Sequence, residues 1–419
     1  MASDVNEGDE RVTAATAPTT KKRKFAEFVR KYFLEGQKLE QEVHHVVQNN
    51  DIDKTSIVER YRKYIGFLIP MCFMQTVWWT LAIRYNIFRL YPTRYELPIT
   101  MILGATVAGM TSEGGGAIAF PVMTLLLHID AAISRDFSLM IQSCGMTSAA
   151  FTIIWMKIII EWHSIVFCSL GAVAGIVFGF HVLDPLMTGA QKKMFFVSIW
   201  FSFALSLFIL NTRKKRRTFE IIGDFCTSKA LVLLLTGFFG GLCSAFVGSG
   251  VDICSFSILT LLFRITEKVA TPTSVVLMAV NTCVGFFWRQ LIMCDISQLA
   301  WEYFEVSVPV VVIFAPLGSL IGSHFHRLVL ASFVYLLEVV ALVGFLFTRP
   351  PISLVLVGAA IIIFRYLLLS SLIIFVRKSF ASSLSIVNSI SRVLLLLAQF
   401  HKFFGWSSAF WAFIYNLLE

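Results

Sequence analysis

The sequence predicts an all-α membrane protein, a polytopic bundle of about ten transmembrane segments. Two observations support this class. First, 57% of the 419 residues are hydrophobic and only 15% are charged, whereas about 25% of the residues in a soluble domain are charged. Second, apolar runs of about 18 or more residues recur along the chain, and each is long enough to cross the hydrocarbon core of a bilayer.

The apolar runs and the charged stretches between them predict the organisation of the chain. The basic residues, which give a net charge of +9, lie mainly in tails and loops. This is the pattern of cytoplasmic flanks in membrane proteins, so we expect a cytoplasmic N-terminus and no nucleic-acid partner. The expected parts are a disordered stretch and then a basic amphipathic helix at 1–62, a first span and loop at 63–96, repeat 1 at 97–212, a basic linker at 213–228, repeat 2 at 229–348, and C-terminal membrane segments at 349–419.

Three consecutive glycines interrupt the apolar run 97–127, in the stretch Thr111-Ser112-Glu113-Gly114-Gly115-Gly116. Each glycine costs about 1 kcal/mol relative to alanine in a helix interior. A broken helix also leaves backbone groups unpaired, which a bilayer tolerates only where protein or a wet cavity covers them. We therefore predict a broken helix and a functional site at this stretch.

A second glycine-rich stretch, Gly248-Ser249-Gly250, interrupts the apolar run 230–263. The surroundings of the two stretches agree: a Thr-Leu-Leu run follows each, and Ser138 has its counterpart in Ser274. Internal repeats of this kind are typical of secondary transporters. We therefore predict two related repeats, each with a broken glycine-rich helix, and expect the repeats to be inverted.

At these residues the sequence resembles the sulfite exporter TauE/SafE family of membrane transporters. Its members pair two membrane halves, each opened by a glycine-rich segment. The first copy here, Gly104 to Pro121, is a close match, and Thr273-Ser274 fits the family's small hydroxyl motif in the second half. The second copy departs from the pattern, because Ser249 replaces the middle glycine and Ser255 stands where proline is expected. The resemblance covers about 97–347 and implies transport of small sulfur-containing anions, such as sulfite or organosulfonates.

The distribution of charge favours a re-entrant course for the glycine-rich segments. If 97–127 crossed the membrane once, the basic cluster at 213–217 would lie outside, against the positive-inside rule. If 97–127 enters and returns as two half-helices, the cluster lies inside, and the two glycine turns meet near the midplane from opposite faces. Lys192 and Lys193 would then lie outside, which favours the alternative of one kinked span.

A helix interrupted at glycines exposes the N–H groups of the following half-helix to a ligand. These groups and the helix dipole attract anions, and glycine permits close approach of the backbone. The alternative is that the glycines only allow close helix packing, which is our interpretation of Gly104, Gly109, Gly171, Gly175 and Gly179. The predicted substrate-binding residues are Thr111, Ser112, Gly114, Gly115, Gly116, Ser138, Gly248, Ser249, Gly250, Thr273 and Ser274.

Two acidic residues, Glu113 and Asp252, lie beside the glycine-rich stretches. Carboxylates within membrane spans are costly and usually functional, and burial favours their protonated form. We therefore hypothesise that both take part in proton coupling. The alternative is that each acid caps a half-helix, where the helix dipole favours a negative charge.

Other polar residues in the spans have less specific explanations. We place Arg289 at the membrane interface, with the lining of a vestibule as the alternative, and Glu161 at the end of a span. Gln142 and Asn281 either face the pathway or form hydrogen bonds between helices.

The sequence contains no GxSxG, Walker A or HExxH motif, so we expect no enzyme activity, no cofactor and no metal. We predict a secondary transporter of small anions. The alternatives are a transporter of another small ion that uses Glu113 and Asp252, and a non-transporting membrane adaptor or receptor on the same scaffold. The expected partners are the small anion and the lipid bilayer, and homo-oligomerisation stays open.

Overall fold

The computed structural model describes residues 61–111, 116–212, 218–223, 225–322, 325 and 327–364. Residues up to Ile362 belong to one compact unit, and a second unit begins at Ile363. Several predicted features lie outside the described residues: Ser112, Glu113, Gly114, Gly115, the amphipathic helix within 1–62, and the C-terminal segments after 364.

Within the described ranges the chain is helical, apart from one isolated bridge between Phe219 and Ile265. Seven of these helices are long and apolar enough to cross a membrane, by length and composition. The predicted fold class, an all-α bundle of membrane helices, is therefore confirmed. The seven candidate spans are Tyr64–Tyr85, Ala131–Trp155, Trp162–Leu186, Gly189–Ile209, Thr227–Val247, Glu267–Ile292 and Gln298–Gly322.

The two halves of the chain contain the same order of helices, a broken pair followed by three long helices. Before them come α4 (Arg62–Tyr85), η3 (Ile87–Leu90) and α5 (Tyr91–Arg94). The first half consists of α6 (Glu96–Met110), α7 (Gly116–Pro121), the π-helical turn η4 (Val122–Leu126), α8 (Ala131–Trp155), α9 (Trp162–Phe178), η5 (Gly179–Leu183), η6 (Asp184–Leu186) and α10 (Gly189–Thr212). The second half consists of α11 (Thr227–Val247), α12 (Val251–Leu261), α13 (Glu267–Phe287), η7 (Trp288–Ile292), α14 (Gln298–Gly322) and α15 (Arg327–Phe347).

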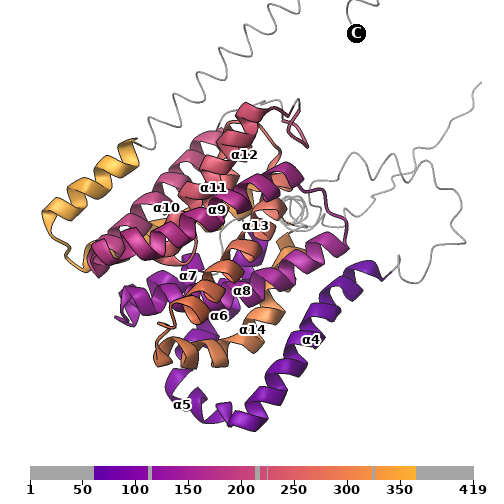
Figure 1. Ribbon diagram of the computed structural model, residues 1–419, viewed down its shortest axis with the longest axis vertical. Coiled ribbons are helices and arrows are strands. Elements are labelled where there is room, and N and C mark those ends of the chain that lie inside the picture. The colour runs from indigo at the N-terminus through magenta and orange to yellow at the C-terminus, as the bar shows by residue number, and fades with distance from the viewer. Residues whose placement is uncertain are drawn as a thin grey trace, which may run out of the picture. The chain divides into compact units, whose positions relative to one another are not determined.

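Helices of the two halves are interleaved (Figure 1). Helix α9 of the first half packs along α11 of the second, and α14 of the second half packs along α6 of the first. Helices α8 and α13, which hold equivalent places in the two halves, pack against each other. This reciprocal exchange is the pattern that a two-fold relation between the halves produces, although the sequence repeat itself stays a prediction.

Glycines allow the interleaved helices to approach closely. A Cβ added to Gly171 of α9 would collide with the carbonyl of Leu234 on α11, and one added to Gly237 of α11 would collide with the carbonyl of Cys168 on α9. On α6, a Cβ at Gly109 would collide with the carbonyl of Ala315. The packing interpretation of Gly109 and Gly171 therefore agrees with the structure, because only a residue without a Cβ fits against a neighbouring backbone.

The bundle has two ends, which we name after buried residues. At the Arg135 end α8 and α10 begin, and the chain leaves α13 through η7. Three ion pairs join these elements: Arg289 Nη2 to Asp136 (2.8 Å), Arg135 Nη1 to Asp184 (2.6 Å) and Lys192 to Asp184 (2.6 Å). At the Glu161 end α8 finishes and α9, α11 and α13 begin.

Helices α11 and α12 form a hairpin that enters and leaves at the Glu161 end. Just before α11, the N–H of Ile222 donates to Glu161 Oε2 (2.7 Å). Just after α12, the carbonyl of Arg264 accepts from the N–H of Phe219 (2.9 Å), in the same linker. The chain therefore turns back at Gly248-Ser249-Gly250, although α11 alone is long enough to span a membrane.

Helices α6 and α7 with η4 form the equivalent hairpin from the Arg135 end. Where α6 begins, Arg94 pairs with Glu302 near the start of α14 (3.0 Å). Where η4 ends, Thr124 accepts a hydrogen bond from Lys193 near the start of α10 (3.0 Å). The run 97–127 is thus two short arms that enter and return, not one kinked span.

Candidate functional site

The tips of the two hairpins meet on one turn of α8. A Cβ added to Gly116, where α7 begins, would collide with the amide of Gln142 and lie 3.3 Å from Ser138 Cβ. In the other hairpin, Gln142 Nε2 donates to the carbonyl of Gly248 (3.2 Å). A Cβ added to Gly248 would lie 2.7 Å from Ser138 Cβ. The two glycine-rich breaks, 132 residues apart by their numbers, therefore share the same two α8 side chains.

Ser138 and Gln142 are buried and incompletely paired. They are 0% and 1% exposed, and among the residues that the structure describes neither Ser138 Oγ nor Gln142 Oε1 has a hydrogen-bond partner. Leaving a buried polar group unsatisfied costs about 1–3 kcal/mol, and proteins contain few such groups. Their position between the two hairpin tips identifies this place as a candidate ligand site.

The other predicted residues around the breaks are also buried. Thr111 ends α6, and its hydroxyl donates to the carbonyl of Val107 (2.9 Å). Ser249 donates to both carboxylate oxygens of Asp252, at 3.0 and 3.3 Å. Asp252 is 0% exposed and lies in the first turn of α12, where the helix dipole favours a negative charge. Gly250 directly precedes α12. A Cβ added there would lie only 2.4 Å from Cys243 Cβ on α11.

Thr273 and Ser274 use their hydroxyl groups elsewhere. Thr273 Oγ1 donates to the carbonyl of Val269 (2.6 Å) and accepts from the N–H of Glu161 (3.0 Å). Ser274 Oγ donates to the carbonyl of Thr271 (2.8 Å). In the described part of the chain, no hydrogen bond and no glycine contact links Thr273 or Ser274 to Gly116 or Gly248. In this conformation Thr273 helps to position Glu161.

Asn281 forms a hydrogen bond between helices, as one of its two interpretations predicted. Its Nδ2 donates to Ser244 Oγ on α11 (2.8 Å), and its Oδ1 has no partner. Ser244 in turn donates to the carbonyl of Gly240 (3.1 Å). Asn281 therefore ties α13 to the arm of the hairpin that leads to Gly248.

A buried ionic cluster near the hairpin tips was not predicted, and Arg289, at the end of α13, belongs to it. Arg289 is only 3% exposed. Its Nε and Nη2 donate to the two carboxylate oxygens of Asp136, at 3.0 and 2.8 Å. Arg135, which is 1% exposed, lies 2.9 Å from the same carboxylate. The adjacent charges Arg135 and Asp136 at the start of an apolar run were the signal in the sequence, because charged residues at membrane depth are usually functional.

The cluster also explains the two lysines that counted against the hairpin topology. Lys192 is 6% exposed and pairs with Asp184, and Lys193 donates to the carbonyl of Thr124. Both lysines are therefore used inside the protein. Their charges lie at the Arg135 end, where they oppose the bias given by the five basic residues of the linker at 213–217.

Glu161, which was expected only at the end of a span, also joins several parts of the chain. It is 1% exposed, caps the start of α9, and holds the linker between the halves through the N–H of Ile222. Its other oxygen lies 2.7 Å from His163 Nδ1, and the His163 ring stacks on Phe225. The Glu161 end is thus closed by contacts between the linker and both halves.

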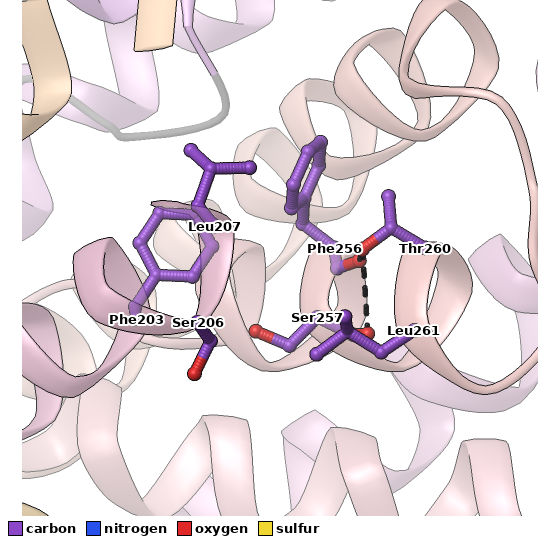
Figure 2. A pocket seen from close by; sticks show the side chains of 7 residues that line it. All are labelled: Phe203, Ser206, Leu207, Phe256, Ser257, Thr260 and Leu261. Carbon is purple, nitrogen blue, oxygen red and sulfur yellow. Dashed lines mark hydrogen bonds between the residues drawn. The ribbon is translucent and has the colours of Figure 1, made fainter. Parts of the chain in front are cut away.

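A small cavity lies between α10 and α12 (Figure 2), and neither Ser138 nor Gln142 is among its lining residues. Its polar lining is a poor match for an anion, because Ser206 and Thr260 each donate to a carbonyl of their own helix, both at 2.7 Å. The lining residues are Phe203, Ser206, Leu207, Phe256, Ser257, Thr260 and Leu261. The meeting point of the hairpins remains the better candidate.

A comparison with protein families decides the class of function. The family model described as "Sulfite exporter TauE/SafE" matches residues 97–347. The chain belongs to the sulfite exporter TauE/SafE family. The matched region begins in the first turn of α6 and ends with α15, so it contains both hairpins and both halves. No curated protein and no solved structure matches the chain.

Membership confirms the resemblance seen in the sequence and places the protein in a family of membrane transporters. Together with the seven apolar helices, it makes this TauE/SafE protein an integral, multi-pass membrane protein.

Proposed function

We propose that this TauE/SafE protein is a secondary transporter of small anions, in first place sulfite or organosulfonates, and that the anion binds where the two hairpin tips meet. The observation that carries the proposal is the convergence of both breaks on Ser138 and Gln142, whose Oγ and Oε1 are buried and unpaired. A transporter that alternates between two faces needs its site where elements from both faces meet.

The proposed site binds an oxyanion with neutral donors. The first N–H groups of a helix have no partner within the helix, so the starts of α12 and of the helical run 116–126 can donate to an anion. The Ser138 hydroxyl adds a donor. The Gln142 amide carries both a donor and an acceptor, so it suits an oxyanion that arrives with a proton. Gly114 and Gly115 remain predicted backbone donors.

Replacing Ser138 with alanine tests the site. Losing one hydrogen bond to a charged group costs about 1.5–3 kcal/mol, so KM for sulfite is expected to rise roughly tenfold to hundredfold. The measurement is uptake of radiolabelled sulfite and taurine by proteoliposomes.

The matched control is Ser148→Ala on the same helix, because Ser148 is equally buried but donates to the carbonyl of Cys144 (3.0 Å). Equal KM values for the two variants would refute the site. If the wild-type protein carries no anion at all, the adaptor or receptor alternative is favoured.

We further propose that Asp252, with Glu113, couples transport to protons. Asp252→Asn keeps an acceptor for Ser249 and removes the titratable group. If protonation must accompany the anion, wild-type flux rises as pH falls, and this pH dependence is expected to disappear in Asp252→Asn and Glu113→Gln. The flux is measured between about pH 5.5 and 8, a range chosen for the assay.

The capping alternative predicts a different result for the same two variants. A capping acid contributes to stability, so its removal lowers the thermal midpoint and leaves the pH profile of the flux unchanged. Retention of the full pH dependence in both variants would exclude coupling through these acids.

We propose that the Glu161 end faces the cytoplasm. At this end α10 stops and the chain continues into the linker, and the five basic residues of positions 213–217 lie between these points in the sequence. This orientation satisfies the positive-inside rule, and it places the N-terminus on the same side, because α4 begins where Arg62 donates to the carbonyl of Trp155 at the end of α8 (3.0 Å).

A further inference from the structure

The ionic cluster lies between the proposed substrate site and the Arg135 end. Ser138 and Gln142 are buried, so an anion reaches them only if the protein opens. Helix α8 begins at Ala131, and Arg135 lies one turn before Ser138 on the same helix. The Arg135 carbonyl is also next to the second hairpin tip, 2.7 Å from a Cβ added to Gly248. A route along α8 from this end to Ser138 therefore passes the cluster.

The carboxylate of Asp136 is bound as a small oxyanion would be. Arg289 contacts both of its oxygens, a bidentate geometry that suits planar carboxylates and other oxyanions. Arg135 contacts the same carboxylate from α8 itself. The ring of Phe180 lies 5.4 and 5.9 Å from the two guanidinium carbons, which adds a cation–π contact to each arginine.

The second partners of the arginines lower the cost of releasing Asp136. Arg135 also pairs with Asp184 (2.6 Å), and Arg289 also pairs with Asp295 (3.1 Å), whose side chain is 74% exposed. Neither guanidinium would be left as an isolated buried charge, which is the most unfavourable outcome of breaking a buried pair.

The charge balance favours an anion in place of Asp136. The cluster contains three cations, Arg135, Arg289 and Lys192, and three acids, Asp136, Asp184 and Asp295. With the Asp136 carboxylate in place it is neutral. With Asp136 withdrawn it carries one net positive charge, which matches a small monoanion.

We propose that Arg135 and Arg289 form an entrance site for the transported oxyanion, and that Asp136 closes this site as a gate until the anion displaces it from the two guanidinium groups. Arg135 comes from α8 and Arg289 from η7 at the end of α13, so the Asp136–Arg289 pair joins elements of the two halves. When the anion displaces Asp136 it takes over this bridge, and α8 and η7 can separate once the anion moves on toward Ser138. The inference rests on the proposed function for the nature of the anion, but its binding test requires no transport.

The first test is the binding of sulfite to Asp136→Asn, measured by titration calorimetry on the purified full chain in detergent. The uncharged amide competes poorly for the arginines. Sulfite is expected to bind Asp136→Asn about tenfold more tightly than it binds the wild type. This is the gain that results if Asp136 occupies the arginine pair of the wild type for about nine-tenths of the time. Adding Arg289→Gln is expected to abolish this gain.

Two further variants test whether the gain in sulfite affinity comes from the entrance site, from the central site or from a general change in charge. When Asp136→Asn is introduced into Ser138→Ala protein, the gain in sulfite affinity is expected to persist. A failure of the proposed central site can therefore be distinguished from a failure of the proposed gate. Glu302→Gln removes an acid from a half-exposed pair with Arg94 at the same end, and it is expected to leave sulfite affinity unchanged. The proposal is refuted if Asp136→Asn binds sulfite no more tightly than the wild type, or if Glu302→Gln gives the same gain.

A second measurement applies if Asp136→Asn does not fold. The double variant Asp136→Asn/Arg289→Gln removes a cation and an anion together, so the net charge of the cluster stays at zero, and the carboxylate that loses Arg289 as a partner is that of the exposed Asp295. Each protein also carries Ser138→Cys, and labelling of the peptide around position 138 by a membrane-impermeant maleimide is followed by mass spectrometry. Labelling is expected to be about tenfold faster without the gate, by the same occupancy argument. Equal labelling rates with and without the Asp136–Arg289 pair would overturn the gate.

Discussion

Gly248→Ala is expected to abolish transport while the protein still folds. Gly248 has φ = +85°, a conformation that costs an L-residue with a side chain roughly 1–2 kcal/mol. The added Cβ would also lie 2.7 Å from both the Arg135 carbonyl and Ser138 Cβ. To relieve these contacts, the hairpin tip must move away from α8, and the two tips then no longer share Ser138 and Gln142. The measurement is sulfite uptake by proteoliposomes, beside size-exclusion chromatography of the same preparation.

Gly223→Ala is the matched control for this prediction. Gly223 lies in the linker at the opposite end of the bundle, and an added Cβ there meets nothing within 4 Å. Wild-type uptake by both variants would show that the close approach of Gly248 to α8 has no part in transport.

Gly237→Ala is expected to cause a large loss of stability. The new Cβ collides with the backbone carbonyl of Cys168 and lies 2.7 Å from Cys168 Cα. Because the obstacle is backbone, no rotamer change relieves it, and α9 and α11 must separate along their whole contact. Overpacking of a well-packed interior costs about 1–3 kcal/mol, and we expect at least the upper end. The thermal midpoint in detergent is the measurement.

Gly189→Ala supplies the comparison for Gly237→Ala. Gly189 begins α10, and a Cβ there would approach only Ala131, at 3.9 Å. Its thermal midpoint is expected to stay the same or rise, since alanine favours a helix more than glycine does. A Gly237→Ala protein as stable as Gly189→Ala would contradict the packing argument.

The two glycine predictions concern different functions of the same residue type. Gly237 lies in the middle of a long helix and allows two helices of different halves to touch. Gly248 ends a helix, reverses the chain and meets the site. The substitutions therefore separate stability from transport: one is read in the thermal midpoint, and the other in uptake by protein that remains folded.

Local properties of the chain were sufficient to predict the class and the positions of the helices. The sequence placed broken apolar runs at 97–127 and 230–263, where the structure has α6, α7 and η4 over 96–126 and α11 and α12 over 227–261. Both glycine-rich breaks were predicted, because helix propensity and the lack of water in a bilayer act on neighbouring residues. The family resemblance over 97–347 also followed from these motifs, and the family model matches the same range.

The partners across the bundle were decided only by the folded structure. Asp136 and Arg289 are 153 positions apart in the sequence, and hydropathy gives no information on which helices carry them to the same depth. Thr273 resembled a substrate residue, yet its hydroxyl contacts Glu161. Gln142 had two open interpretations until Gly116 and Gly248 were found on either side of it. Helix formation is governed by local backbone and solvent energies, whereas these contacts depend on how two hairpins enter from opposite ends and pack on α8.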